Sequence, residues 1–373
     1  MTNTALVIGA RGVIGGTLAD HLAGLPDWRV VGLSRRGGPA GPVRHLQADL
    51  FDPAQLRAAL REVPVTHLFH AAYQDRPSWS ELVEPNVTML RNVLDAVPTG
   101  QLQHVSLMQG YKVYGAHLGP FATPAREDDP PHLPPEFNVD QQQLLEERAA
   151  AADWTWSAIR PSVVAGVGLG NPMNLVVVLA GYAAISAELG VPLRFPGKPG
   201  AYHALLELTD AGLLAEATVW AATEPRAGGQ AFNIANGDLF RWSRMWPAVA
   251  DAFGIEVAPP LPMSLAEVMA DKEPVWDAMV ARHGLAATPY SDVSAWTFGD
   301  AVFGWDYDMI GDTSKARRFG FHRHVETEPM LRGLFDDLRR RRIIPWSGGC
   351  AHRVRRQGEC PLREIRQPGA PRP

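Results

Sequence analysis

Cysteine is nearly absent from this 373-residue chain, and the two that occur, Cys350 and Cys360, lie close to its C-terminal end. A disulfide framework or a cysteine-based zinc site therefore does not hold the fold together. His352 stands between the two cysteines, which is a weak indication of a metal site. The simpler interpretation is a pair of free thiols in a disordered tail, and we expect no metal centre.

A long hydrophobic run is missing as well. No stretch of about 18 apolar residues could span a bilayer, and no charged and then apolar leader precedes the first core segment. The formal net charge of −5 gives no electrostatic reason to expect nucleic acid or an anionic membrane as a partner. With 46% hydrophobic residues, the composition is that of an ordinary globular enzyme, and we expect a cytoplasmic protein.

The most informative stretch is residues 5–16, ALVIGARGVIGG. Residues 5–8 predict a strand buried on both faces, and residues 17–23 predict a helix. Between them, Gly9, Gly12 and Gly15 form the glycine motif, and the first of these permits a tight turn. The second lets backbone approach a pyrophosphate, and the third lets helix and strand pack together. The predicted pyrophosphate site comprises Gly9, Arg11, Gly12, Val13, Ile14 and Gly15.

Strand-like and helix-like segments then alternate up to residue 165. We predict strands at 29–34, 43–48, 66–70, 104–108 and 156–160, and helices at 53–62, 80–96 and 141–152. This alternation predicts an α/β fold, a doubly wound, parallel Rossmann-type sheet. We assign residues 1–170 to an NADP-binding Rossmann core. We expect residues 171–345 to form a smaller, partly helical substrate region interleaved with the last core strands and helices, and residues 346–373 a disordered tail rich in Arg, Pro and Gly.

An acidic residue is missing where an NAD-binding unit needs one, at the end of the second strand. Ser34, Arg35 and Arg36 occupy this place, and their hydroxyl and guanidinium groups would bind a 2′-phosphate. Arg11 could reach the same phosphate. A solvated basic loop is the alternative, but after this glycine pattern we predict NADP(H) rather than NAD(H).

The remaining adenosine contacts are expected at the ends of the next two strands. Asp49, followed by Leu50, could accept a hydrogen bond from the adenine amino group, or it could cap the helix that begins at Pro53. The small residues Ala71 and Ala72 would let backbone pass close to the adenosine ribose. Tyr73 follows them near the cofactor and the substrate.

Longer strings resemble one family, the progesterone 5-beta-reductase and iridoid synthase group of the extended short-chain dehydrogenase/reductases. GARGVIG at 9–15, LSRR at 33–36 and LMQGYK at 107–112 resemble its glycine turn, cofactor loop and LQTGRK string. IRPSVVAG at 159–166 resembles its HRPGTIFG, and WTFGD at 296–300 its WWFAD. The resemblance extends over about residues 4–345.

This resemblance implies NADPH-dependent 1,4-reduction of an α,β-unsaturated carbonyl on a small or medium apolar substrate. Lys112 matches the family's lysine, which with a tyrosine stabilises the developing enolate oxygen. The resemblance also implies cofactor contacts from Met108, Lys112, Pro161, Val164 and Met173. Substrate contacts are expected from Tyr73, Val139, Tyr182, Trp296 and Phe298. Most of the 11 tryptophans fall after residue 200, where they could line an apolar cavity or fill a core.

The family's tyrosine is missing. Its NFYYxxED segment corresponds to residues 136–143, EFNVDQQQ, so the two tyrosine positions fall on Asn138 and Val139. Three explanations stay open. Enone reduction could continue with Asn138, Tyr114, Tyr73 or water as donor. The site could bind NADPH for another purpose, or the register could differ without functional consequence. Carbonyl reduction is a further alternative, and the sequence leaves the oligomeric state open, with a homodimer as one option.

Overall fold

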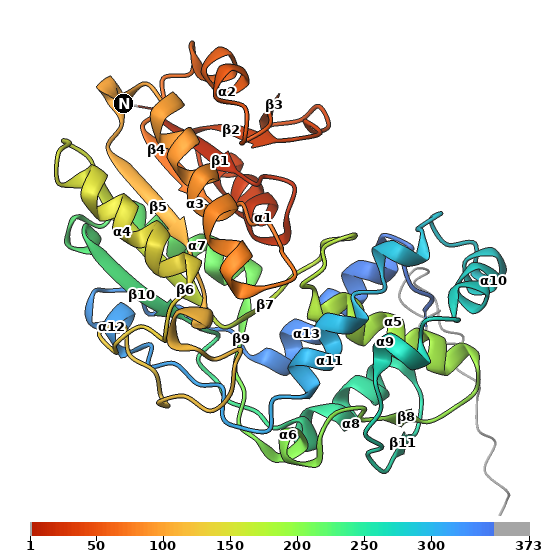
Figure 1. Cartoon of the computed structure of the whole chain (residues 1–373). Coiled ribbons are helices and arrows are strands. Elements are labelled where there is room, and N and C mark those ends of the chain that lie inside the picture. Colours follow the sequence, from red (N-terminus) through yellow and green to blue (C-terminus); the bar gives the residue numbers. More distant parts are fainter. Residues whose placement is uncertain (1, 347–373) are drawn as a thin grey trace, which may run out of the picture.

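A computed structural model describes residues 2–346, so the two cysteines and His352 lie outside the described residues. Its centre is a 7-stranded parallel sheet with the order β10-β6-β5-β4-β1-β2-β3 (Figure 1). The order reverses between β4 and β1, which is the crevice where doubly wound sheets bind ligands. The predicted fold class is confirmed. The seven strands are β1 (Asn3–Ile8), β2 (Trp28–Ser34), β3 (Arg44–Gln47), β4 (His67–His70), β5 (His104–Met108), β6 (Thr155–Pro161) and β10 (Gln230–Ile234).

Helices cover both faces of this sheet, which is why residues 5–8 of β1 are apolar without a break. Ala5 and Val7 pack in one cluster with residues of α1 and α7, whereas Leu6 and Ile8 pack in another with residues of α2, α3 and α4. Successive side chains of a strand point to opposite faces, so a doubly covered strand has no polar side. These helices are α1 (Val13–Ala23), α2 (Pro53–Leu60), α3 (Trp79–Ala96), α4 (Phe137–Ala149) and α7 (Ala211–Thr223).

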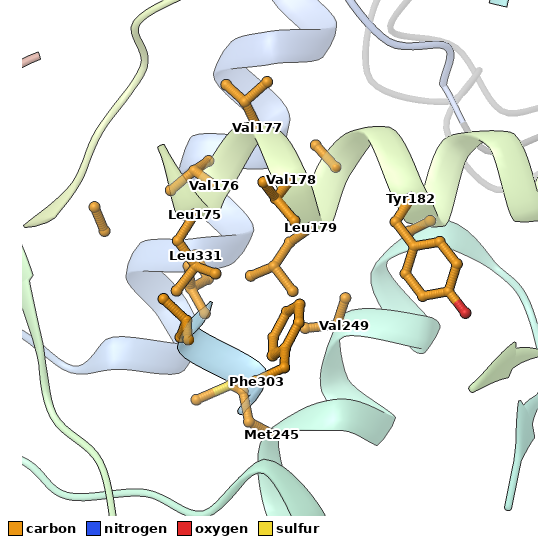
Figure 2. Packing of buried hydrophobic residues seen from close by; sticks show 14 of the residues in the cluster. Leu175, Val176, Val177, Val178, Leu179, Tyr182, Met245, Val249, Phe303 and Leu331 are labelled. Atoms are coloured by element: carbon orange, nitrogen blue, oxygen red, sulfur yellow. The ribbon is translucent and has the colours of Figure 1, made fainter. Parts of the chain in front are cut away.

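The C-terminal region is a mainly helical body beside the sheet (green to blue in Figure 1). Its central helix, α5 (Leu175–Glu188), is buried on all sides from Leu175 to Ser186. In Figure 2, Leu179 of α5 packs in one hydrophobic cluster with Val249 and Phe303. The other α-helices here are α6 (Pro199–His203), α8 (Trp242–Phe253), α9 (Leu265–Val268), α10 (Glu273–His283), α11 (Trp296–Phe303), α12 (Ser314–Arg318) and α13 (Thr327–Arg340).

Short elements complete the described chain. Two small parallel sheets pair β7 (Val163–Ala165) with β9 (Leu208–Asp210) and β8 (Leu193–Arg194) with β11 (Val257–Ala258). The 3-10 helices are η1 (Thr99–Gln101), η2 (Tyr111–Tyr114), η3 (Pro225–Ala227) and η4 (Tyr290–Asp292). Within residues 2–346, no helix combines the length and apolar character needed to cross a bilayer.

Three details differ from the sequence predictions. Helix α1 begins at Val13 and α4 at Phe137, each earlier than predicted. The early start of α4 follows from its cap, because the Glu136 carboxylate accepts a hydrogen bond from the Val139 N–H. The alternative role of Asp49 as a helix cap is wrong. Asp52 caps α2 by accepting from the N–H groups of the first turn.

Candidate active site

The glycine turn after β1 has the shape that a dinucleotide requires. Gly9 adopts φ +81°, and a Cβ there would lie 2.9 Å from the carbonyl oxygen of Ala71. A Cβ on Gly15 would lie 2.4 Å from the Gly9 oxygen, so α1 approaches the turn closely only because this residue is glycine. Gly12 caps α1, and its free side has no heavy atom closer than 3.5 Å. Backbone is therefore open to a phosphate at the helix N-terminus.

Three arginines, one in the glycine turn and two directly after β2, have no ion-pair partner in the part of the chain that the structure describes. Arg11, Arg35 and Arg36 are exposed, and none forms an ion pair with another residue of the 2–346 range. Ser34 donates a hydrogen bond from its hydroxyl to the Gly37 carbonyl, which closes the loop that carries two of them. Unpaired guanidinium groups beside a glycine turn fit the phosphates of a dinucleotide.

Other predicted cofactor residues gather where the parallel strands end. Ile14, Met108 and Val164 pack against the same hydrophobic cluster, although they come from α1, β5 and β7. Ala71 follows β4 directly and donates its N–H to Ile8. Asp49 accepts a hydrogen bond from the Phe51 N–H. The predicted residues that lie at or near these strand ends also include Leu50, Ala72, Tyr73 and Pro161.

Lys112 stands on η2, just after β5, between two aromatic rings. Its Nζ lies 5.1 Å from the centre of the Tyr73 ring and 5.4 Å from that of the Trp79 ring. No carboxylate of the described residues lies within salt-bridge distance of it. Burial lowers the pKa of Lys112, while the nearby charges of Asp75 and Glu136 oppose this effect. The Lys112 amine is thus held against two aromatic rings without a carboxylate in direct contact within the described residues.

Tyr73 is tied to Asp75. Its hydroxyl donates a hydrogen bond to Asp75 Oδ1 at 2.9 Å, and burial raises the pKa of this phenol. The ring also contacts Phe137, at 5.5 Å between centres. Tyr73 therefore brings the start of α4 next to Lys112.

The first turn of α4 holds the positions where the family has tyrosines. Asn138 is buried and donates from Nδ2 to Glu136 Oε1 at 2.7 Å, while Glu136 Oε2 accepts from the Val139 N–H at 3.2 Å. Burial raises the pKa of the Glu136 carboxyl. The Asn138 carbonyl accepts a hydrogen bond from Gln109 Nε2 at 2.8 Å. The Asn138 amide is thus directed toward Glu136, and Val139 offers only an apolar side chain.

Tyr114 is engaged elsewhere. Its hydroxyl donates to Asn233 Oδ1 at 2.7 Å and accepts from Arg160 Nη1 at 3.0 Å, and burial raises its pKa to about 12. Arg160 is itself buried and also donates to the side chains of Gln109 and Gln142. This guanidinium joins the ends of β5 and β6 to α4, so the Tyr114 phenol belongs to the framework beneath the site.

Two of the predicted substrate residues lie in the C-terminal core. Tyr182 donates its hydroxyl to the Arg194 carbonyl, and Trp296 donates from Nε1 to the Tyr290 hydroxyl (Tyr182 is labelled in Figure 2). Both side chains are buried, whereas Phe298 is half-buried and Met173 is 38% exposed. Trp242, Trp246 and Trp276 are fully buried, so the core interpretation holds for these tryptophans.

A family model described as a PRISE-like Rossmann-fold domain matches residues 45–345. The chain belongs to this PRISE-like family. A (S)-8-oxocitronellyl enol synthase of Nepeta racemosa is 37% identical over 85% of each chain. A 3-oxo-Delta(4,5)-steroid 5-beta-reductase of Arabidopsis thaliana is 35% identical over 92% of this chain and 93% of its own. The resemblance drawn from the sequence is confirmed.

Solved structures extend the likeness of this PRISE-like chain at the level of the fold. A UDP-glucose 4-epimerase superposes with a TM-score of 0.66 at 15% identity, covering 91% of this chain and 98% of the epimerase. The Bordetella bronchiseptica enzyme WbmG, solved in complex with NAD, has a TM-score of 0.64 at 17% identity, with 92% and 96% covered. The extended short-chain dehydrogenase/reductase fold is therefore shown.

A cavity of about 400 Å³ borders the turn that carries Lys112 in this PRISE-like chain. It is formed by the connection between η2 and α4, which the sequence marks as long and rich in Pro and Gly. Its lining is largely apolar, with three titratable groups, and comprises Tyr114, Gly115, Leu118, Gly119, Pro120, Phe121, Ala122, Asp129, Pro130 and His132.

Several residues at the site escaped the sequence analysis. Trp79, Asp75 and His117 lie near Lys112, and Arg160 donates a hydrogen bond to Tyr114 on the same 3-10 helix. The first two follow Tyr73 closely in the chain, so the position of that tyrosine could have signalled them. His117 and Arg160 had no such signal, because their neighbours are set by the path of a loop and by packing between strands.

Proposed function

We propose that this PRISE-like protein is an NADPH-dependent reductase that performs 1,4-reduction of an enone or enal. The observation that carries the proposal is Lys112, an ammonium group beside the crevice that has no carboxylate partner in the described chain. Relatives at 35% identity bear the names of an enol synthase and a steroid 5-beta-reductase. A free cation at this place can stabilise negative charge that develops on a carbonyl oxygen.

NADPH, when bound, supplies a hydride to the β-carbon of the substrate. The glycine turn would hold its pyrophosphate, and Arg11, Arg35 and Arg36 would hold its 2′-phosphate. Lys112 would stabilise the enolate oxygen, and the α-carbon can take its proton from water. With these roles, no side chain has to donate a proton to the substrate. Conjugate reduction is therefore supported over carbonyl reduction, because the tyrosine of the family is replaced in this chain.

The cavity lined by Leu118, Pro120 and Phe121 supports a small or medium apolar substrate. It is of a size that accommodates such a molecule, and it borders the Lys112 turn. Most of its lining has no charge to stabilise an ionic substrate. We propose that this cavity receives the apolar part of the substrate.

The first test is NADPH oxidation, followed by absorbance, with cyclic enones, an enal and the matching saturated ketones. We expect turnover of the unsaturated compounds only. Lys112→Ala should lower kcat by about 10²–10³, as expected for the loss of an oxyanion donor, while NADPH affinity changes far less. Arg91→Ala, an exposed change on α3 away from Lys112, serves as control.

A second candidate is an NADP(H)-binding protein without redox turnover, which the apolar Val139 favours. The same assay with a Val139→Tyr variant separates the two. A native chain that binds NADPH tightly and reduces nothing, with activity restored by Val139→Tyr, would establish the binding protein. Turnover by the native chain would exclude it.

The cofactor preference has its own test. We expect NADPH to bind more tightly than NADH. Arg35→Ala combined with Arg36→Ala should weaken NADPH binding by about hundredfold or more, because the double variant loses two charge-assisted hydrogen bonds of about 1.5–3 kcal/mol each. NADH affinity should not change, and Arg57→Ala on the exposed face of α2 is the control. Equal affinities of the native chain for NADH and NADPH would contradict the proposal.

A further inference from the structure

His117 lies in the same connection as the cavity and has no role in the mechanism above. Its ring centre is 4.2 Å from that of Trp79, with the ring planes at 65°. Lys112 Nζ lies 5.4 Å from the centre of the same Trp79 ring. The imidazole and the ammonium group therefore share one aromatic neighbour. The charge of Lys112 also acts on the imidazole, since it contributes to the lowered pKa of His117.

The charge state of His117 is defined by its surroundings. Burial, followed by the charges of Lys112 and His132, lowers the pKa of His117 to about 4. The ring is therefore neutral at pH 7, with a hydrogen on one nitrogen and a lone pair on the other. A neutral imidazole next to a cation can donate a hydrogen bond to an oxygen that gains negative charge.

One ring nitrogen of His117 lacks a partner. Nδ1 is shielded from solvent, and no described residue forms a hydrogen bond with it. Burying a polar atom without a hydrogen-bond partner destabilises the folded chain, and a ligand that supplies the missing partner removes this penalty. His70 also has unpartnered nitrogens, but it is 1% exposed and sits on β4 between Ile8 and Leu107. His117, in contrast, is only half-buried and contacts the Trp79 ring that Lys112 also contacts.

We propose that His117 is a further catalytic residue, whose neutral ring N–H donates a hydrogen bond to the substrate carbonyl oxygen that Lys112 stabilises. This inference rests on the proposed function and deepens it. The imidazole keeps its proton throughout, and water protonates the α-carbon, so no additional acid is consumed. His117 thereby supplies the neutral donor that Val139 cannot provide.

The kinetic test uses His117→Phe, which keeps a flat ring against Trp79 and removes the donor. We expect kcat for enones to fall by about 10², as for the loss of one oxyanion donor, with NADPH affinity unchanged. His117→Gln retains a neutral N–H and should recover part of the loss. His322→Phe, the same change at an exposed histidine outside the site, should have little effect. Unchanged kcat in His117→Phe would overturn the inference.

A binding test separates the failure of this inference from the failure of the proposed function. 4-Nitrophenolate mimics an enolate oxygen, and its binding to the NADP⁺-loaded protein is followed by absorbance without turnover. We expect His117→Phe to weaken this binding at least tenfold and His322→Phe to leave it unchanged. If the native chain reduces no enone but the variants show this pattern of binding, the proposed function is wrong and the His117 contact is supported.

A measurement on the native chain avoids variants that fail to fold. In ¹⁵N spectra of the imidazole nitrogens, 4-nitrophenolate should move the resonances of His117 and leave those of His70 in place. If the His117 N–H points to the indole face of Trp79 instead, its resonances will not respond. That result would overturn the inference.

Discussion

Glu207 is the buried carboxyl group with the clearest consequence for stability. It is 3% exposed, and its Oε1 accepts hydrogen bonds from the Tyr111 hydroxyl at 2.6 Å and from the Gly311 N–H at 2.7 Å. Burial raises the pKa of Glu207 from 4.5 to about 7, although both hydrogen bonds oppose the shift. Tyr111 directly precedes Lys112, so this carboxyl supports the turn on which the lysine stands.

The sign and size of the effect follow from this raised pKa. Between pH 4.5 and about 7 the folded chain holds a proton that the unfolded chain releases. The contribution of Glu207 to stability is therefore complete below pH 4.5 and is lost as the pH rises through 7. At about 1.4 kcal/mol per pH unit, this loss amounts to about 3 kcal/mol.

Glu207→Gln imitates the protonated carboxyl at every pH and keeps Oε1 for both donors. We expect the variant to match the native chain near pH 4.5 and to be more stable by about 3 kcal/mol at pH 8. The assay is urea unfolding of both chains across this range. The difference between the two chains in free energy of unfolding reports the contribution of the Glu207 carboxyl alone, because the buried histidines titrate equally in both chains. Glu62→Gln, on the exposed surface, should give no difference at any pH. A constant difference for Glu207→Gln would refute the reasoning.

Two further predictions concern the glycine turn and a helix cap. Gly15→Ala should weaken NADPH binding at least tenfold in a fluorescence titration, because its Cβ would meet the Gly9 oxygen at 2.4 Å. Unaltered binding would show that α1 can shift away from the turn. Asp52→Ala should lower the free energy of unfolding, measured in urea, by about 1 kcal/mol because α2 loses its N-cap. Asp49→Ala should lower it by less than half of this amount. The reverse order would contradict the capping assignment.

The sequence predicts the sheet well because the relevant signals are local. Ala5, Leu6, Val7 and Ile8 are all apolar, and both faces of β1 are covered. Helix starts are harder to locate where capping is weak or unexpected. Asp49 and Asp52 are equally good caps by composition, and only the backbone path decides that Asp52 faces the first turn of α2. The C-terminal tryptophans could not be divided between core and cavity, since hydrophobicity alone does not report what a ring packs against.

The candidate site could be predicted only in part. The glycine turn and the arginines after β2 belong to contiguous patterns, so their proximity follows from the βαβ unit. Lys112 and His117 lie five residues apart, but their shared neighbour Trp79 comes from the start of α3, and this meeting depends on the path of the chain after η2. From the sequence, Tyr114 is a candidate donor to the substrate oxygen. Its hydroxyl is instead bound to Arg160 and Asn233, which are distant in the chain, so no local pattern reveals these hydrogen bonds.

The replaced tyrosine bears on which carbonyl compounds this site can reduce. Reduction of a saturated ketone leaves an alkoxide, which needs a proton at the oxygen as the hydride arrives, and a phenol is suited to that task. Here the Asn138 amide is held by Glu136, and the Tyr114 hydroxyl is held between Asn233 and Arg160. Lys112 remains as a cation that can stabilise an enolate, a weaker base than an alkoxide. The arrangement therefore favours enones over ketones, so turnover of saturated ketones at comparable rates would show that a proton donor at this site has been overlooked.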